Sequence, residues 1–325
     1  MGLFSRKEKD SFTIKNGVCT VRFVGKKKLT KKRVDAFFMQ NKEIHDCDTV
    51  EVIIGKNTNV IEKHAFGHRP FASVTIPSSV IAIGELAFSG HVSCFNVDES
   101  NQNFKSVDGD LYTKDGKVLI TYAKGKPDKD FNVPDGVTTI DKGAFYGSKL
   151  VHIWLPESVT TISDNSFNGC AYLTSLTIPS KVTAIESKAF YFCEKLQTVT
   201  IPNSVTSIGR EAFWHCDALT SITIPGSVTS IGDCAFGYCK SLKIINILPG
   251  VKSIGTRAFE WSGFRMEVTI PSSVISIGAH ALTSASVIYC QVGKQPKGWN
   301  LQWKGDSRAS VKWGWEIDGG KQLND

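Results

Sequence analysis

The cysteines are the side chains of this chain with the widest chemical repertoire, because a thiolate can act as a nucleophile, bind a metal or form a disulfide. Four of the nine recur at a constant spacing of 23 residues, namely Cys170, Cys193, Cys216 and Cys239. In a stacked array, equivalent residues of neighbouring coils lie about 4.8 Å apart with parallel side chains, whereas a disulfide needs Cβ atoms roughly 3.5–4.5 Å apart and a torsion near 90°. The spacing therefore predicts a ladder of structural thiols, and the lack of a C-x-x-C pair disfavours a metal or redox site.

Other residue patterns that carry catalysis are missing from the sequence. It contains no G-x-S-x-G, no H-E-x-x-H, no Walker loop and no G-x-G-x-x-G. The seven histidines are scattered, and none stands at a metal-ligand interval from a cysteine or carboxylate partner. We therefore predict a protein that is not an enzyme, has no metal and no cofactor, and acts on no small-molecule substrate.

The cysteines belong to a longer tandem repeat that positions them. A phenylalanine marks each copy, and successive copies are 22 or 23 residues apart: Phe145, Phe167, Phe190, Phe213, Phe236 and Phe259. A fixed period in the range of 20–50 residues is typical of a stacked array, and such arrays generally serve as binding surfaces.

One copy, residues 219–241, shows how a coil buries its apolar side chains. Residues 219–224 end in an alternation of apolar and small polar side chains, which predicts a short strand that Pro225 terminates. The stretch DCAFGYC then directs Ala235, Phe236 and Cys239 inward and is too short for a full helix, so we expect a single helical or 3₁₀ turn. The phenylalanines of successive coils should form a continuous stack.

The repeats are interrupted once and need caps at both ends. Residues 1–43 predict a basic N-terminal cap, made of a hairpin over 12–24 that turns at Asn16-Gly17 and a helix after Thr30 whose inner face carries Val34, Phe37 and Phe38. Residues 44–289 predict the array itself. An insertion at about 89–131 carries two hairpin signals, Asp108-Gly109 and Asp115-Gly116. Residues 290–325 are rich in tryptophan, which predicts a C-terminal cap, with a ligand platform as the alternative.

The repeat unit L-x-x-I-x-I-P-x-S-V-T-x-I-G-x-x-A-F-x-x-C resembles the BspA-type leucine-rich repeat, and the resemblance covers about residues 50–290. It implies a β-rich solenoid of about nine coils of 22–24 residues, with an inserted hairpin region and capped ends. Relatives of this kind are largely binding and adhesion proteins, many displayed on cell surfaces. The resemblance thus adds a cell-surface adhesin to the hypotheses.

The outward positions of the main strand are the candidate binding face. Just before the strand-ending proline, one column holds Thr177, Thr200 and Thr223, and Trp154 occupies the same position two residues after His152. Exposed aromatic residues are enriched in interface hot spots, so Trp154 and His152 are the candidate contact residues. The mostly neutral hydroxyl face favours a protein partner, with a glycan as the alternative.

Charge gathers at the N-terminus. Residues 1–42 hold twelve Lys and Arg against three acidic residues, while the whole chain has a net charge of +7. The run that dominates this excess comprises Lys26, Lys27, Lys28, Lys31, Lys32 and Arg33. A solvated cap is the simpler interpretation, and contact with nucleic acid or an anionic membrane is the less favoured alternative.

The sequence shows no secretory signal, which predicts a cytoplasmic protein if Met1 is the native start. The family resemblance favours the alternative of a surface or secreted protein.

Overall fold

The computed structural model describes residues 9–24, 27–263 and 266–315. The chain divides into two compact units. Unit 1 comprises residues 1–127 and 142–145, and unit 2 comprises residues 128–141 and 146–325. Both are built from coils that stack through parallel strands, so the predicted β-solenoid is confirmed. The coils number about eleven rather than nine, because strands at both ends of the chain continue the parallel stacking.

Unit 1 is built on a five-stranded sheet in the order β1-β2-β4-β6-β8. Its strands are β1 (Ser11–Lys15), β2 (Val18–Phe23), β4 (Thr49–Ile54), β6 (Ser73–Ile76) and β8 (Phe95–Val97). Strands β1 and β2 form the predicted antiparallel hairpin, and both Asn16 and Gly17 adopt positive φ angles, +49° and +76°. This geometry matches the twist of paired strands, which is why Asn-Gly forms such turns well. From β2 onward the strands are parallel.

A helix and a short second sheet complete the coils of unit 1. Helix α1 (Lys31–Gln40) begins where predicted, since the Thr30 hydroxyl accepts a hydrogen bond from the Arg33 N–H at 3.1 Å. The 3₁₀ helix η1 (Lys42–Asp46) leads from α1 into β4. The second sheet contains β3 (Lys28–Leu29), β5 (Val60–Ile61) and β7 (Ala82–Ile83).

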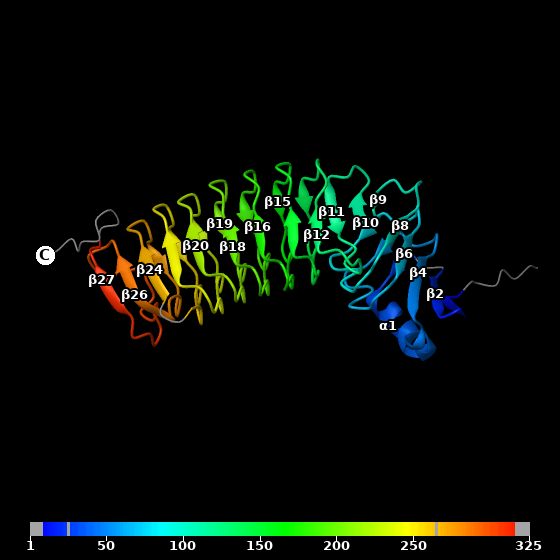
Figure 1. Cartoon of the computed structure of the whole chain (residues 1–325), viewed down its shortest axis with the longest axis horizontal. Coiled ribbons are helices and arrows are strands. Elements are labelled where there is room, and N and C mark those ends of the chain that lie inside the picture. Colours follow the sequence, from blue (N-terminus) through cyan, green and yellow to red (C-terminus); the bar gives the residue numbers. More distant parts are fainter. Residues whose placement is uncertain (1–8, 25–26, 264–265, 316–325) are drawn as a thin grey trace, which may run out of the picture. The chain divides into compact units, whose positions relative to one another are not determined.

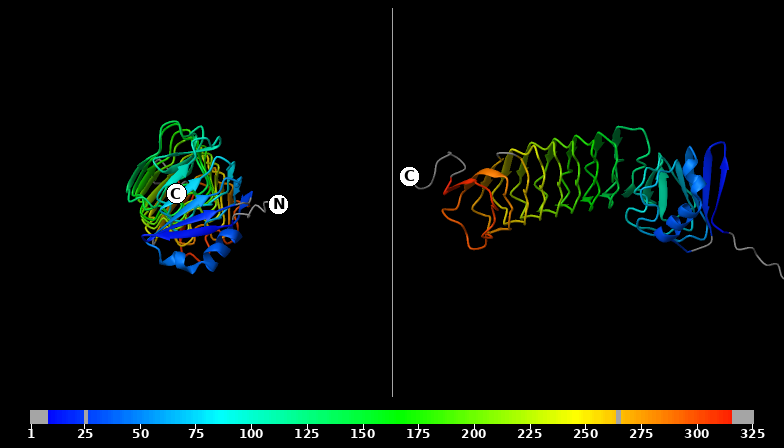
Figure 2. Two further views of the ribbon diagram at one scale, coloured as in Figure 1. Left: turned by 90° about the vertical axis from the view of Figure 1, so that its right-hand side faces the viewer. Right: turned by 90° about the horizontal axis from the view of Figure 1, so that it is seen from below.

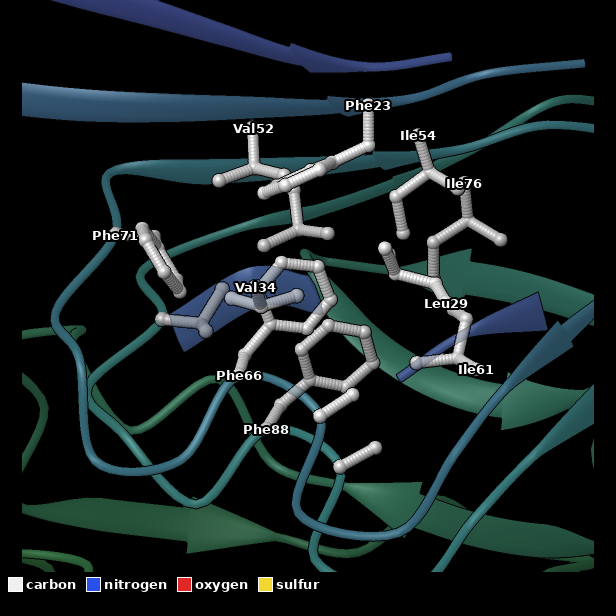
Figure 3. Packing of buried hydrophobic residues seen from close by; sticks show 14 of the residues in the cluster. Phe23, Leu29, Val34, Val52, Ile54, Ile61, Phe66, Phe71, Ile76 and Phe88 are labelled. Carbon is white, nitrogen blue, oxygen red and sulfur yellow. The ribbon is translucent and has the colours of Figure 1, made fainter. Parts of the chain in front are cut away.

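Aromatic and aliphatic side chains pack together in the core of unit 1 (Figure 3). Val34, Phe37 and Phe38 of α1 are buried, as predicted. Phe66 lies at the centre, with ring centroids 5.9 Å from Phe23 and 5.1 Å from Phe88. The α1 helix is only ten residues long, so this packing rather than helix propensity holds it in place.

The predicted hairpins of the insertion are present in unit 1. Strands β9 (Phe104–Val107), β10 (Asp110–Thr113) and β11 (Val118–Thr121) pair antiparallel in sequence order. The first turn uses Asp108 and Gly109, both at positive φ, and the second uses Asp115, whose carboxylate accepts the Lys117 N–H at 3.0 Å. These turns extend the unit without adding a regular coil.

Unit 2 stacks regular coils through two parallel strands in each (Figures 1 and 2). The longer strands are β12 (Asp130–Asn132), β14 (His152–Trp154), β16 (Ser175–Thr177), β18 (Thr198–Thr200), β20 (Ser221–Ile224), β22 (Ile244–Ile247), β24 (Met266–Ile270), β26 (Ala285–Cys290) and β27 (Ser310–Trp313). The shorter strands are β13 (Thr139–Ile140), β15 (Thr161–Ile162), β17 (Ala184–Ile185), β19 (Ser207–Ile208), β21 (Ser230–Ile231), β23 (Ser253–Ile254) and β25 (Ser276–Ile277). The shorter strands from β17 to β25 keep a constant register from coil to coil, whereas the register of the longer strands shifts once, between β24 and β26.

The phenylalanines of unit 2 form the predicted stack. From Phe167 to Phe259, neighbouring ring centroids lie 5.0 to 5.2 Å apart and the ring planes differ by no more than 7°. Phe145 lies in unit 1 instead, where its ring packs against Tyr122 at 5.7 Å.

The stretch around each phenylalanine contains single turns closed by hydrogen bonds between residues three apart, as expected, and no helix. In the coil of Phe236, both Cys234 and Tyr238 have positive φ, +55° and +59°. This left-handed backbone turns the N–H of Tyr238 toward the next coil, where it donates to the Glu260 carbonyl at 2.8 Å. Hydrogen bonds between coils therefore alternate with single turns inside the coil, such as the one in which the Gly237 N–H donates to the Cys234 carbonyl at 3.0 Å.

Tryptophans fill the C-terminal end of unit 2. Trp299 and Trp303 are each only 3% exposed, and their ring centroids lie 5.0 Å apart. Both indole N–H groups find acceptors, Trp299 on the Val274 carbonyl at 3.1 Å and Trp303 on the Gln295 side chain at 3.3 Å. Buried, hydrogen-bonded indoles suit a cap rather than a ligand platform.

Candidate functional site

The predicted contact residues share one exposed face of unit 2. Each of their strands alternates, so the central residue is buried or partly buried while its two neighbours point to solvent, as in β14, where Ile153 lies between His152 and Trp154. Trp154 is 52% exposed. The exposed members are His152, Trp154, Thr177, Thr200 and Thr223. We call these five residues the sheet face.

His152 fixes the position of Trp154 at one end of the sheet face. The two rings stack with centroids 5.7 Å apart and an interplanar angle of 30°. On its other side, His152 Nδ1 lies 2.7 Å from Asp130 Oδ1, on the adjacent strand β12. A carboxylate, an imidazole and an indole therefore stand together on a rigid parallel sheet. Such a group offers hydrogen bonds and a large apolar surface, which suits recognition rather than bond cleavage.

Two strands of small hydroxyl side chains continue the sheet face beyond Trp154. In the register of β16 and β18, Ser175 lies opposite Thr198 and Thr177 lies opposite Thr200. All four are exposed. These four side chains carry no formal charge, so a ligand would meet hydroxyl groups at the spacing of neighbouring strands, about 4.8 Å.

The basic run at the N-terminus is partly neutralised within unit 1. Arg33 forms a bidentate ion pair with Asp10 and also donates to the Val24 carbonyl at 2.6 Å. Lys31 pairs with Asp35 at 2.5 Å. The exposed lysines of the run are Lys27, Lys28, Lys31 and Lys32, and Lys26 lies outside the described residues. Arg33 and Lys31 therefore form ion pairs within the N-terminal cap.

The thiol column lies in the core of unit 2, as the spacing predicts. The thiols of Cys193, Cys216 and Cys239 each donate to the carbonyl of the phenylalanine in the preceding coil, over 3.1 to 3.3 Å. Burial raises the pKa of Cys193 and of Cys216 well above the usual value of a thiol. All nine cysteines are free thiols. These buried groups are structural hydrogen-bond donors, because a protonated, inaccessible thiol is a poor nucleophile.

A column of aromatic rings in unit 2, half-buried except for the exposed Trp261, escaped the sequence prediction. Two residues after the core phenylalanine, four successive coils carry Phe192, His215, Tyr238 and Trp261, all at φ between +54° and +59°. His215 lies between its neighbours, with ring centroids 4.6 Å from Phe192 and 4.8 Å from Tyr238. The two preceding coils have glycine here, the residue that this backbone favours. The recurrence of aromatic residues at this repeat position could have predicted the column from the sequence.

Two classes of site find no support among the described residues. In residues 9–24, 27–263 and 266–315, no group of three or more His, Cys, Asp and Glu side chains is placed to hold a metal ion. Within the same residues, no helix combines the length and the apolar character needed to cross a bilayer.

The stacked coils and the exposed sheet face define the class: a leucine-rich repeat solenoid, which is in general a repeat-based binding module and typically not an enzyme. The family model for the BspA type leucine rich repeat region matches the chain over residues 39–116, 122–243 and 206–292, in six copies. The chain belongs to this family.

Solved structures of bacterial proteins share this fold. A leucine rich cell surface protein from Faecalibacterium prausnitzii is 30% identical with a TM-score of 0.57, and the match covers 61% of this chain and 53% of that protein. The chain therefore spans about half the length of that relative. A leucine-rich repeat protein from Eubacterium ventriosum is 19% identical with a TM-score of 0.50, over 76% of this chain and 91% of that one. A search of curated proteins finds no match to this chain.

Proposed function

We propose that this protein binds another protein through the sheet face of unit 2 and performs no chemistry on it. The observation that carries the proposal is Trp154, a tryptophan 52% exposed on a regular parallel sheet and held by the ring of His152. Tryptophan is among the residues most enriched in hot spots. The side chain is already positioned, so binding costs little side-chain entropy.

The hydroxyl groups beside Trp154 support the rest of the contact area. Ser175, Thr177, Thr198 and Thr200 present short side chains that lose little rotamer freedom on binding. They allow a partner to approach the sheet closely, and they carry no charge that would have to be desolvated. A glycan is the alternative ligand for this surface, since its hydroxyl groups can exchange hydrogen bonds with the same residues.

The experiment compares three forms of the full chain as bait for proteins extracted from its surroundings. Trp154→Ala should lose the partners that the wild type retains, by at least about tenfold, because a hot-spot truncation costs about 2 kcal/mol or more. Trp261→Ala is the matched control, since Trp261 is 60% exposed but lies outside the sheet face. Equal retention by all three forms would contradict the proposal, and loss only on a panel of immobilised glycans would move it to the glycan alternative.

The similarity to a cell surface protein from Faecalibacterium prausnitzii favours a more specific role. We propose that the chain is displayed outside the cell, where the sheet face would act in adhesion. Protease treatment of intact source cells, followed by blotting for the full-length chain, tests this location. Degradation on intact cells supports display, whereas protection until lysis contradicts it and leaves the binding role to be tested in the cytosol.

A further inference from the structure

Four successive coils of unit 2 carry an aromatic side chain on a backbone that suits glycine. We call these four residues the aromatic column: Phe192, His215, Tyr238 and Trp261. A side chain with a Cβ atom raises the energy of this left-handed backbone, and the two preceding coils avoid that cost with glycine. Bulky residues kept at such positions point to a role for the surface that they form.

The neighbouring repeat position widens the column. Gly237 has no side chain, and a Cβ atom there would lie only 2.3 Å from the Trp214 ring. The Trp214 ring fills this space and contacts Tyr238, with ring centroids 4.6 Å apart. At the C-terminal end of the column, Trp261 is 60% exposed, and the next coil has Ser284 in the equivalent position. The column therefore ends in an indole that is largely open to solvent.

The polar atoms of these rings are available to a ligand. Within the part of the chain that the structure describes, the indole N–H groups of Trp214 and Trp261 and the hydroxyl of Tyr238 make no hydrogen bond. Those of Trp214 and Tyr238 are not buried either. They therefore face water, as the polar ends of tryptophan and tyrosine do at interfaces.

Ion pairs accompany the column along the chain. They are Lys188–Glu211, Arg210–Glu211, Lys240–Asp217 and Arg257–Glu260, over 2.7 to 3.6 Å. In these pairs each cation has a carboxylate partner, so a charged ligand would gain little net attraction. The same groups can still exchange hydrogen bonds with an uncharged ligand that carries hydroxyl groups.

We propose that the aromatic column is a second binding site, separate from the sheet face, and that it binds an uncharged linear oligosaccharide. From Phe192 to Tyr238, neighbouring ring centroids lie 4.6 and 4.8 Å apart, which is close to the length of one pyranose residue in such a chain. An oligosaccharide that lies along the column therefore meets one coil with each sugar. Its C–H groups pack against the aromatic side chains, and its hydroxyl groups meet the indole N–H groups and the ion pairs.

The rings are held in place before a ligand binds. His215 stacks between Phe192 and Tyr238, and its Nδ1 lies 3.3 Å from Asp217 Oδ1. Little side-chain entropy is therefore lost when a sugar chain binds, and the periodic spacing selects a ligand that is itself periodic.

The first experiment measures binding of four uncharged hexasaccharides to the full chain by isothermal titration calorimetry. The probes are cellohexaose, chitohexaose, maltohexaose and β-1,4-mannohexaose. At least one of them should bind, and its affinity should rise with chain length up to the four coils of the column and then level off. The proposal is overturned if none of the four binds, or if binding is seen only with acidic controls such as heparin and hyaluronan oligosaccharides.

The second experiment places the sugar on the column. Combining Tyr238→Gly with Trp261→Gly removes two rings and leaves a residue that suits the positive φ, so the affinity should fall at least about tenfold in a folded protein. Trp154→Ala is the matched control, because it removes an exposed indole from the sheet face and should bind the sugar as the wild type does.

A melting curve and the protein capture described above separate the other roles of the column. A purely structural column predicts a lower melting temperature with unchanged sugar affinity, and this result would overturn the proposal. Loss of protein partners instead of sugar by the double variant would also overturn it, and would assign the column to a protein. If the double variant does not fold, Trp261→Ala replaces it, since this side chain is exposed and should still lose sugar affinity.

Discussion

The two units bury phenylalanine in different ways. In unit 1, Phe66 meets Phe71 edge to face at 84° and Phe23 at 72°, while it stacks on Phe88 at 14°. In unit 2, every ring from Phe167 to Phe259 is nearly parallel to its neighbours. Near-identical repeats place the same side chain in the same setting, so the rings can only stack. Degenerate repeats with an added helix let the rings interlock instead.

The two kinds of packing should differ in how far the destabilisation caused by removing one core side chain extends through the unit. Each coil of unit 2 contacts mainly its two neighbours, so its stability should behave as a sum of nearest-neighbour terms. In unit 1 one ring connects several elements. Substitutions of corresponding phenylalanines in the two units test whether their cores differ in this way.

The largest effect is expected for Phe66→Ala in unit 1. Its removal leaves a cavity against three rings, and we expect the free energy of unfolding to fall by about 5 kcal/mol, the upper end for a buried aromatic. Hydrogen exchange measured by mass spectrometry should show lost protection in α1 as well as in the sheet. Unchanged protection of α1 would mean that the core of unit 1 is no more connected than that of unit 2.

Phe213→Ala in unit 2 should have a somewhat smaller effect, about 3–4 kcal/mol. The loss of protection should be confined to its own coil and the two adjacent coils, as followed by hydrogen exchange. Thr223→Ala, on the exposed sheet face, is the control and should leave protection unaltered. Uniform loss of protection throughout unit 2 would contradict the nearest-neighbour description.

Substitutions of Cys216 test how tightly the thiol column fits. Cys216→Ser should cost no more than about 1 kcal/mol, because Ser262 occupies the equivalent position and its hydroxyl donates to the Phe236 carbonyl. Cys216→Val removes the donor and adds volume, and should cost about 1–3 kcal/mol. Urea denaturation of both variants gives the comparison. Equal costs would show that the hydrogen bond to the carbonyl of Phe190 contributes nothing.

The smallest effect is a difference in alkylation rate that should not involve stability at all. Because burial raises the pKa of Cys193 and Cys216, their thiolate forms are scarce at pH 8 and remain so at pH 9. Iodoacetamide should therefore modify the partly buried Cys47, Cys94 and Cys234 before the column, which should stay intact until the chain unfolds. Labelling resolved by peptide shows the order, and early modification of Cys216 would place the column outside the core.

The sequence predicts what depends on local chemistry and on repetition. The fold class, the phenylalanine stack and the turn at Asn16-Gly17 follow from residue types at fixed spacings. The alternation around Trp154 was enough to predict an exposed aromatic residue on the main strand. What that residue binds is a property of the partner, so no pattern in this chain encodes it.

Contacts between segments that are distant along the chain could not be predicted from the sequence. The pairing of Cys19 with Val50 requires the parallel register of β2 and β4, which neither segment specifies alone. The left-handed backbone at Tyr238 goes against the preference of an aromatic residue, so local propensity does not predict it. Stacking on the ring of His215 offsets that local cost only once the coils are assembled.

The constant register of the coils that carry β17 to β25 also has a genetic consequence. The Thr206 hydroxyl bonds the carbonyl of Thr183, and the Thr229 hydroxyl bonds that of Thr206, each across 23 residues. After an in-frame duplication or deletion of one 23-residue segment, each of these hydrogen-bonding groups would again face an equivalent partner in the adjacent coil. Unequal recombination can therefore lengthen or shorten this part of the protein without inventing a new interface, so related strains should differ in length by whole coils.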